Sequence, residues 1–193
     1  TRYKIYDSSV MRIDQIGIFS VGDLKLEIID GIEDYFQLMQ NIFDLDQIGD
    51  FLKQDFSIVF DAMNAITGPY AKRIFNKKIG LSEKSIINGN PLNDFGKLHP
   101  DPNLTYAKEL ADLLLNQKSY DFGAACDGDG DRNMILGKGC FVNPSDSLAV
   151  ITANSNLVPA YKKGINGVAR SMPTSMAVDS VAKKLQIPCY ETP

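Results

Sequence analysis

The sequence predicts an α/β fold, in which helices are layered on a mixed β-sheet. Short apolar runs bounded by Gly, Pro, Asn or Asp have the length of strands, and they alternate with longer segments whose apolar residues recur at helical spacing. This alternation is typical of α/β domains. The apolar content of 44% over 193 residues allows a sizeable core.

The first expected elements are a strand, a helix and a second strand. Residues 24–29 alternate between apolar and charged side chains, as a half-buried strand does, and from Asp30 onward the apolar residues fall at helical spacing. Residues 56–60 form a short run rich in apolar and β-branched side chains. We expect this run to be a strand that ends at Asp61.

The middle of the chain continues the alternation. Pro69 suits the first turn of a helix, and Gly80 is placed to end that helix. A strand near residues 84–88 leads into a loop rich in Pro, Gly, Asn and Asp over 88–103. A helix is then expected over 104–116.

The remaining elements are a hairpin, a helix and a strand-helix-strand unit. Strands are predicted over 120–126 and 133–137, on either side of a short acidic loop, and Asn143-Pro144 start a helix that extends to about Leu157. Beyond a glycine-containing joint, the expected βαβ unit consists of a strand over 167–171, a helix over 173–185 and a strand over 187–191.

The acidic loop Asp127-Gly-Asp-Gly-Asp-Arg132 carries the most specific chemical signal in the chain. Its three negative charges repel one another unless a cation neutralises them. The glycines permit backbone angles that other residues avoid, so the chain can curl until the carboxylates converge. Carboxylate oxygens are hard ligands suited to Mg²⁺, Ca²⁺ or Mn²⁺. Asp127, Asp129 and Asp131 are therefore predicted to bind a divalent cation.

An EF-hand loop also opens with alternating aspartates, but this loop lacks the other features of that motif. An EF-hand needs glycine at position six and glutamate at position twelve, between two helices. Here these positions hold Arg132 and Lys138, and the flanks are predicted strands. A guanidinium beside a metal is repelled unless both face a shared anion, so Arg132 indicates a phosphate partner. An ion pair between Arg132 and one of the aspartates is the alternative.

The segment from Asp121 to Lys138 resembles the metal-binding loop of the α-D-phosphohexomutase family, and within it the eukaryotic-type phosphoglucomutase branch. The resemblance extends from about residue 25 to the end of the chain. Other segments that fit the family are 61–70, 99–106, 141–147, 169–175 and 190–193. The resemblance implies a chain of repeated α/β domains. Residues 1–31 would be the tail of a first domain, 32–158 a second domain with the acidic loop, and 159–193 the start of a third.

The resemblance also implies an activity. Enzymes of this branch interconvert glucose 1-phosphate and glucose 6-phosphate through a phosphoserine enzyme and a glucose 1,6-bisphosphate intermediate. By resemblance Mg²⁺ is the cofactor, Asp127, Asp129 and Asp131 are its ligands, and Arg132 contacts the phosphosugar or the phosphoserine.

The nucleophile of the family lies in a Thr-Ala-Ser-His-Asn-Pro loop, and no segment of this chain matches that loop. We therefore expect this chain to be a central fragment of a longer enzyme, to contact the other domains of that enzyme, and to be inactive by itself. A non-catalytic cation-binding protein of the same fold, with a structural or regulatory role, is the alternative.

Three further polar residues are weaker site candidates. His99 is the only histidine and could act as a general base, but its place in a Pro-containing loop favours a structural role. Asp61 ends a predicted central strand, where sites of α/β proteins gather, although a capping role towards residues 64–68 is favoured. Arg170 either approaches a phosphate or belongs to a turn that caps the next helix.

Composition and cysteine spacing argue against several other classes of protein. A net charge of −4 argues against a nucleic-acid partner, and no uninterrupted apolar run is long enough to span a bilayer. Cys126, Cys140 and Cys189 lack the spacing of a zinc site or a disulfide framework, which predicts a reduced, cytoplasmic setting. Because the chain does not begin with Met, a lost targeting segment stays an open alternative.

Overall fold

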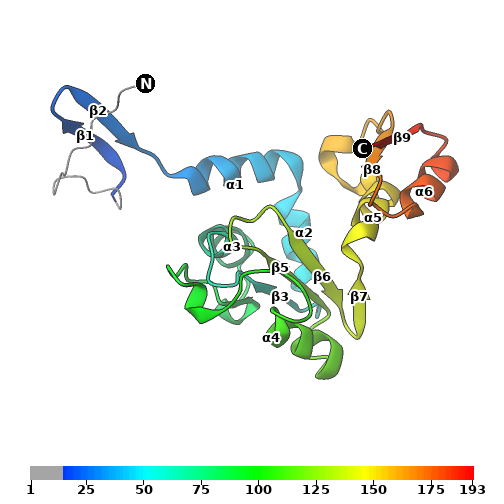
Figure 1. The fold of residues 1–193 in the computed structure, drawn as a ribbon, viewed down its shortest axis with the longest axis horizontal. Coiled ribbons are helices and arrows are strands. Elements are labelled where there is room, and N and C mark those ends of the chain that lie inside the picture. Colours follow the sequence, from blue (N-terminus) through cyan, green and yellow to red (C-terminus); the bar gives the residue numbers. More distant parts are fainter. Residues whose placement is uncertain (1–14) are drawn as a thin grey trace.

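The computed structural model describes residues 15–193, and its centre is a five-stranded mixed sheet (Figure 1). The strand order is β4-β3-β5-β6-β7. β3 pairs in parallel with both β4 and β5, whereas β6 pairs antiparallel with both β5 and β7, so the predicted mixed sheet is confirmed. Its strands are β3 (Ile58–Asp61), β4 (Ile86–Ile87), β5 (Phe122–Cys126), β6 (Asn133–Gly137) and β7 (Cys140–Val142).

Helices lie on both faces of this sheet, which agrees with the predicted fold of helices layered on a mixed sheet. Two of the helices continue into wider π-helical turns, α3 through Lys72–Lys78 and α4 through Asp112–Asn116. The α-helices are α1 (Gly31–Ile42), α2 (Leu45–Leu52), α3 (Thr67–Ala71), α4 (Lys108–Ala111), α5 (Ser147–Ala153) and α6 (Ala177–Leu185). Short 3₁₀ turns occupy Glu83–Ser85, Phe95–Lys97, Pro144–Asp146, Ser155–Leu157 and Pro159–Tyr161.

The main core lies between the sheet and the α4 helix. Leu110 and Leu114 of this helix are fully buried. Gly123 of β5 lets the helix approach closely, because a Cβ there would lie 2.8 Å from a methyl carbon of Leu114. The buried cluster comprises Val59, Met63, Ala107, Leu110, Ala111, Leu114, Ala125, Met134 and Leu136. Burial of so many apolar side chains is the main contribution to stability here.

The opposite face of β3 packs against the helix that begins with α3. The ring of Phe60 on β3 lies 5.9 Å, between centroids, from the ring of Phe75. Helix α1 then packs on the outside, where Tyr35 and Tyr70 meet edge to face with centroids 5.2 Å apart. The acidic loop is thus attached to a sheet held between helical layers.

Two smaller sheets lie outside the central one (Figure 1). β1 (Gly17–Val21) and β2 (Leu24–Ile28) form an antiparallel hairpin. β8 (Val168–Ser171) and β9 (Cys189–Thr192) pair in parallel and are connected through α6, which confirms the expected βαβ unit. Residues 1–31 were expected to be the end of a preceding domain, and the first fourteen of them lie outside the described residues. No helix in the part of the chain that the structure describes could cross a membrane.

Several element boundaries differ from the sequence-based expectation. Strands β1 and β7 were not predicted. The segment after Asp30 forms two helices, α1 and α2, and the side chain of Asp44 starts α2 by accepting a hydrogen bond from the backbone N of Gln47. The helix expected over 104–116 begins only at Lys108, because Asn103 holds the preceding residues in a turn. The helix expected over 144–157 is divided into two 3₁₀ turns and α5.

Candidate metal centre

The acidic loop connects β5 to β6 at the carboxyl end of a central strand. β5 ends at Cys126, which pairs across the hairpin with Asn133, and the backbone N of Asp127 donates to the carbonyl oxygen of Arg132 at 3.3 Å. Because β3 runs parallel to β5, the carboxyl ends of both strands meet at the same edge of the sheet. This edge is where α/β proteins place their sites.

Asp127 folds the loop around its own carboxylate. Its Oδ1 accepts hydrogen bonds from the backbone N–H groups of Gly130 and Arg132, each at 3.0 Å, and its Oδ2 accepts from Nε of Arg132 at 3.0 Å. The residue is only 3% exposed. Gly130 has φ +83°, a conformation that is strained for residues with a Cβ. Asp127 therefore fixes the loop, and the glycine permits its curvature.

The structure brings the three predicted metal ligands together. Asp129 and Asp131 are exposed beside the buried Asp127, and one carboxylate oxygen of each of the three residues lies within 4.8 Å of the others. A cluster of this size and composition fits a hard divalent cation that uses carboxylate oxygens and water as ligands.

The charges in the loop perturb one another. Burial raises the pKa of Asp127, but the hydrogen bonds and positive charge of Arg132 outweigh burial, so this pKa lies below its ordinary value. Hydrogen bonding with Asp127 and the negative charges of Asp129 and Asp127 raise the pKa of Asp131. Repulsion of this kind is what a bound cation relieves, so the electrostatics of the donor set also fit a metal.

Arg132 makes two hydrogen-bonded ion pairs, and its Nε also lies 3.8 Å from Oδ1 of Asp131. Its Nε donates to Oδ2 of Asp127, and its Nη1 donates to Oδ1 of Asp101 at 2.8 Å. The alternative in which Arg132 pairs with an aspartate of the loop is therefore present in the structure. Within the described residues, Nη2 makes no hydrogen bond, and the side chain is 61% exposed. The guanidinium can still donate to an external anion while both ion pairs are kept.

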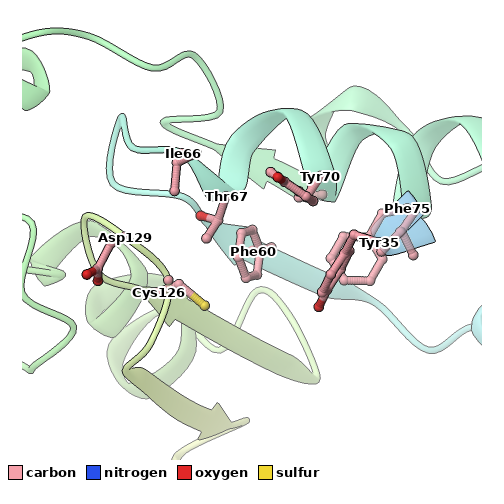
Figure 2. A pocket seen from close by; sticks show the side chains of 11 residues that line it. Tyr35, Phe60, Ile66, Thr67, Tyr70, Phe75, Cys126 and Asp129 are labelled. Atoms are coloured by element: carbon pink, nitrogen blue, oxygen red, sulfur yellow. The ribbon is translucent and has the colours of Figure 1, made fainter. Parts of the chain in front are cut away.

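A hollow of about 370 Å³ adjoins the acidic loop (Figure 2). Asp129 is one of its polar lining residues. Thr67 also lines it, and the buried hydroxyl of Thr67 has no hydrogen-bond partner among the described residues. Burial and the charge of Asp127 raise the pKa of the Cys126 thiol to about 11, so this thiol is neutral. The remaining lining residues are Tyr35, Phe60, Ile66, Tyr70, Ala71, Ile74, Phe75 and Gly130.

The comparison with known families gives a consistent result. The sequence model described as phosphoglucomutase/phosphomannomutase, alpha/beta/alpha domain II, matches residues 33–139, which is more than half of the 193 residues. The chain belongs to the phosphoglucomutase/phosphomannomutase family. The resemblance seen in the sequence is thereby confirmed, and the matched range contains the complete acidic loop.

Relatives in this family extend well beyond the chain. A phosphoglucomutase of Rhizobium radiobacter is 52% identical over 191 residues, which cover 99% of this chain and 35% of the relative. The chloroplastic phosphoglucomutase of Arabidopsis thaliana is 50% identical over 192 residues, which cover 98% of this chain and 31% of the relative. The chain spans about a third of the length of the curated relatives it matches.

A solved structure of the family shows the same fold. The crystal structure of the exocytosis-sensitive phosphoprotein pp63/parafusin (phosphoglucomutase) from Paramecium, in its open form, matches with a TM-score of 0.87 at 50% identity. The match covers 95% of this chain and 34% of that one. The phosphohexomutase-type α/β fold predicted from the sequence is confirmed.

Two of the weaker candidates have structural contacts. His99 stacks on Tyr106 with ring centroids 4.3 Å apart, which fits the structural role favoured for it. Asp61 is 2% exposed, and its Oδ1 accepts from the backbone N of Met63 at 2.8 Å and from Nδ2 of Asn88 at 3.0 Å. Asp61 thus stabilises the turn just before residues 64–68, close to the expected capping position. Burial raises its pKa against the lowering effect of these two hydrogen bonds.

Arg170 forms ion pairs with two carboxylates at the end of β8, and its two predicted roles stay predictions. Its nearly buried side chain donates to Asp179 at 2.6 and 3.2 Å, and its Nη2 lies 2.7 Å from a carboxylate oxygen of Glu191. These ion pairs join β8 to α6 and β9.

Sequence reasoning missed Asp101, the partner of Arg132, because the two residues are 31 positions apart and no periodic pattern links them.

Proposed function

We propose that this chain supplies the Mg²⁺-binding loop of a phosphoglucomutase that interconverts glucose 1-phosphate and glucose 6-phosphate. The convergence of three carboxylates within 4.8 Å, next to an arginine that keeps a free donor, is the observation that carries this proposal. Membership of the family and the printed names of the relatives support the choice of reaction.

Asp127, Asp129 and Asp131 would hold the cation. Bound Mg²⁺ would supply positive charge that stabilises the oxygens of a phosphoryl group during transfer. Asp127 has a second role, because its hydrogen bonds from Gly130 and Arg132 set the curvature of the loop. Its lone pairs are not exhausted by these bonds, since each carboxylate oxygen can accept from more than one partner.

Arg132 would bind a phosphate oxygen of the phosphosugar or of the phosphoserine. Its guanidinium is held on one side by Asp127 and on another by Asp101, so it can receive an anion without first being ordered. An arginine next to a metal site is a recurrent arrangement for phosphoryl groups, because both charges act on the same oxygens.

The remaining steps of the reaction need residues that this chain does not contain. The proposed cycle uses a phosphoserine and passes through glucose 1,6-bisphosphate, and no segment of the sequence matches the family's serine loop. We therefore propose that turnover requires the rest of a longer protein, and that the 193-residue chain alone has none. The three cysteines are free, and we propose a reducing compartment, the cytoplasm, for the longer protein.

An activity assay tests the proposal. A longer protein that includes this chain is given glucose 1-phosphate, glucose 1,6-bisphosphate and Mg²⁺, and glucose 6-phosphate is measured. We expect turnover that EDTA abolishes and that Asp129→Asn lowers by about 10²–10³, the usual effect of losing one group that stabilises developing charge. Failure of the wild type to turn over, with Mg²⁺ still bound, would favour the non-catalytic cation-binding alternative.

A further inference from the structure

A second loop lies against the acidic loop and supports it. We call residues 95–106 the support loop. A Cβ placed on Gly128 of the acidic loop would lie 3.5 Å from the ring of Phe95 and 3.6 Å from Pro100, which are ordinary contact distances. The apolar side chains of Phe95 and Pro100 therefore lie close to the backbone of Gly128, and the ion pair between Arg132 and Asp101 also joins the two loops.

Asp101 is held at both of its carboxylate oxygens. Oδ1 accepts from Nη1 of Arg132 at 2.8 Å, and Oδ2 accepts from Nδ2 of Asn103 at 2.9 Å. The side chain is 27% exposed, so water competes only partly for these contacts. The carboxylate has little freedom to turn away from the arginine.

Asn103 connects this carboxylate to the main core. Its Oδ1 accepts from the backbone N–H groups of Thr105 and Tyr106 at 2.9 and 3.0 Å, and its carbonyl oxygen accepts from the backbone N of Ala107. The next residues form α4, whose Leu110 is fully buried. A continuous chain of contacts therefore leads from the core through Asn103 and Asp101 to the guanidinium.

We propose that Asp101 is a positioning residue for Arg132. Two carboxylates from different loops, Asp127 on Nε and Asp101 on Nη1, fix the plane of the guanidinium and leave Nη2 for a phosphate oxygen. The inference rests on the proposed function, since it assigns an anion to Arg132. An arginine that is already ordered loses less side-chain freedom when the anion binds.

Simple electrostatics predicts the opposite effect of removing the Asp101 charge. A negative charge 2.8 Å from Arg132 weakens the attraction of that arginine for an anion, so neutralising the charge should strengthen phosphate binding. Positioning predicts that phosphate binding weakens instead. The sign of the change therefore separates the two accounts.

The test measures binding of inorganic phosphate to the 193-residue chain in saturating Mg²⁺ by ³¹P NMR titration. The variants are Asp101→Asn, Arg132→Met and the double variant, with Asp94→Asn as the control. Asp94 is an exposed aspartate just before the support loop that caps the N–H of Gly96, so its substitution removes a nearby charge without breaking the pair. Circular dichroism establishes that each variant is folded.

We expect Asp101→Asn to weaken phosphate binding about tenfold, as when a charge-assisted hydrogen bond is no longer well placed. Asp94→Asn should leave the affinity unchanged, and Asp101→Asn should have no further weakening effect in the Arg132→Met background. The ¹⁵N-detected Nε–H of Arg132 should also exchange faster with water in Asp101→Asn, without any ligand.

Three results would overturn the inference. Tighter phosphate binding in Asp101→Asn would show that the residue acts only through its charge. An equal loss in the wild-type and Arg132→Met backgrounds would show that Asp101 acts independently of the arginine. If Arg132→Met itself binds phosphate as tightly as wild type, the phosphate role of Arg132 in the proposed function fails first.

Discussion

The Cγ2 methyl of Thr67 lies 2.8 Å from the position that a Cβ on Gly130 would occupy. The beginning of α3 therefore lies close to the backbone of the acidic loop, although the two residues are far apart in the sequence. Helix α3 therefore leaves little space beside the loop at Gly130, and the carboxylate of Asp127 holds the loop from within.

Gly130→Ala is therefore expected to destabilise the chain for two reasons. The positive φ of +83° is strained for alanine, which costs about 1–2 kcal/mol, and the added methyl overlaps Thr67, which costs about 1–3 kcal/mol more. Urea unfolding measures the combined decrease in the free energy of unfolding. Gly80→Ala is the matched control, because Gly80 has φ +84° and no atom within 4 Å of its Cβ position.

The Thr67→Ser change separates the cost of the overlap with Thr67 from the cost of the positive φ. Serine lacks the Cγ2 methyl, so Gly130→Ala should cost less in the Thr67→Ser background than in the wild type. A Gly130→Ala variant that loses no more stability than Gly80→Ala would contradict the close approach of Thr67 to Gly130.

Asp61→Asn is expected to make unfolding less dependent on pH. Burial raises the folded-state pKa of Asp61 above its unfolded value. The protonated carboxyl group therefore contributes its full stability below the unfolded pKa. This stability is lost as pH rises through the folded-state pKa. Asparagine keeps an oxygen that can accept from Met63 and Asn88, without a charge.

Urea unfolding of both proteins from about pH 3.5 to pH 7 measures this effect. The stability of Asp61→Asn relative to wild type should increase as pH rises over this range. Asp23→Asn, at an exposed residue between β1 and β2, is the control for removing one negative charge. A difference between Asp61→Asn and wild type that is constant with pH would refute the assignment of a buried, desolvated carboxyl group.

The three cysteines are expected to react at very different rates with iodoacetamide at pH 8. A pKa of about 11 leaves only about one Cys126 thiol in a thousand ionised, and that side chain is also partly buried. Cys140 is exposed and should be labelled first. Peptide mass spectrometry gives the order, and labelling in urea, where all three should react alike, is the control. Cys126 reacting as fast as Cys140 would be inconsistent with the structure around the loop.

Local patterns predicted most of the central sheet and the acidic loop. β5, β6 and the loop between them follow from two apolar runs around Asp127-Gly-Asp-Gly-Asp, where strand length and glycine positions are encoded within a few residues. Gly80 also ends its helix as expected, with φ +84°. These features depend on neighbouring residues, so the sequence suffices to find them.

Long-range contacts were not predictable in the same way. The pairing of Arg132 with Asp101 depends on how the support loop folds over the sheet, and the pairing of Arg170 with Asp179 and Glu191 depends on the parallel βαβ unit. β7 was missed because three residues are too short for a periodic signal. The α4 boundary was misplaced because Asn103 caps a turn before the helix, an effect of one side chain on the local backbone.

The central claim, that the acidic loop binds Mg²⁺ together with a phosphate, is tested most directly by calorimetric titration of Mg²⁺ into the 193-residue chain, with and without a phosphoserine peptide. We expect weak binding alone and tighter binding with the peptide, because Mg²⁺ combines carboxylates with waters and phosphate oxygens. Asp129→Asn should weaken binding by about tenfold or more, and Asp50→Asn, at an exposed helical residue, should not. Equally tight binding with and without the peptide, or no effect of Asp129→Asn, would contradict the account.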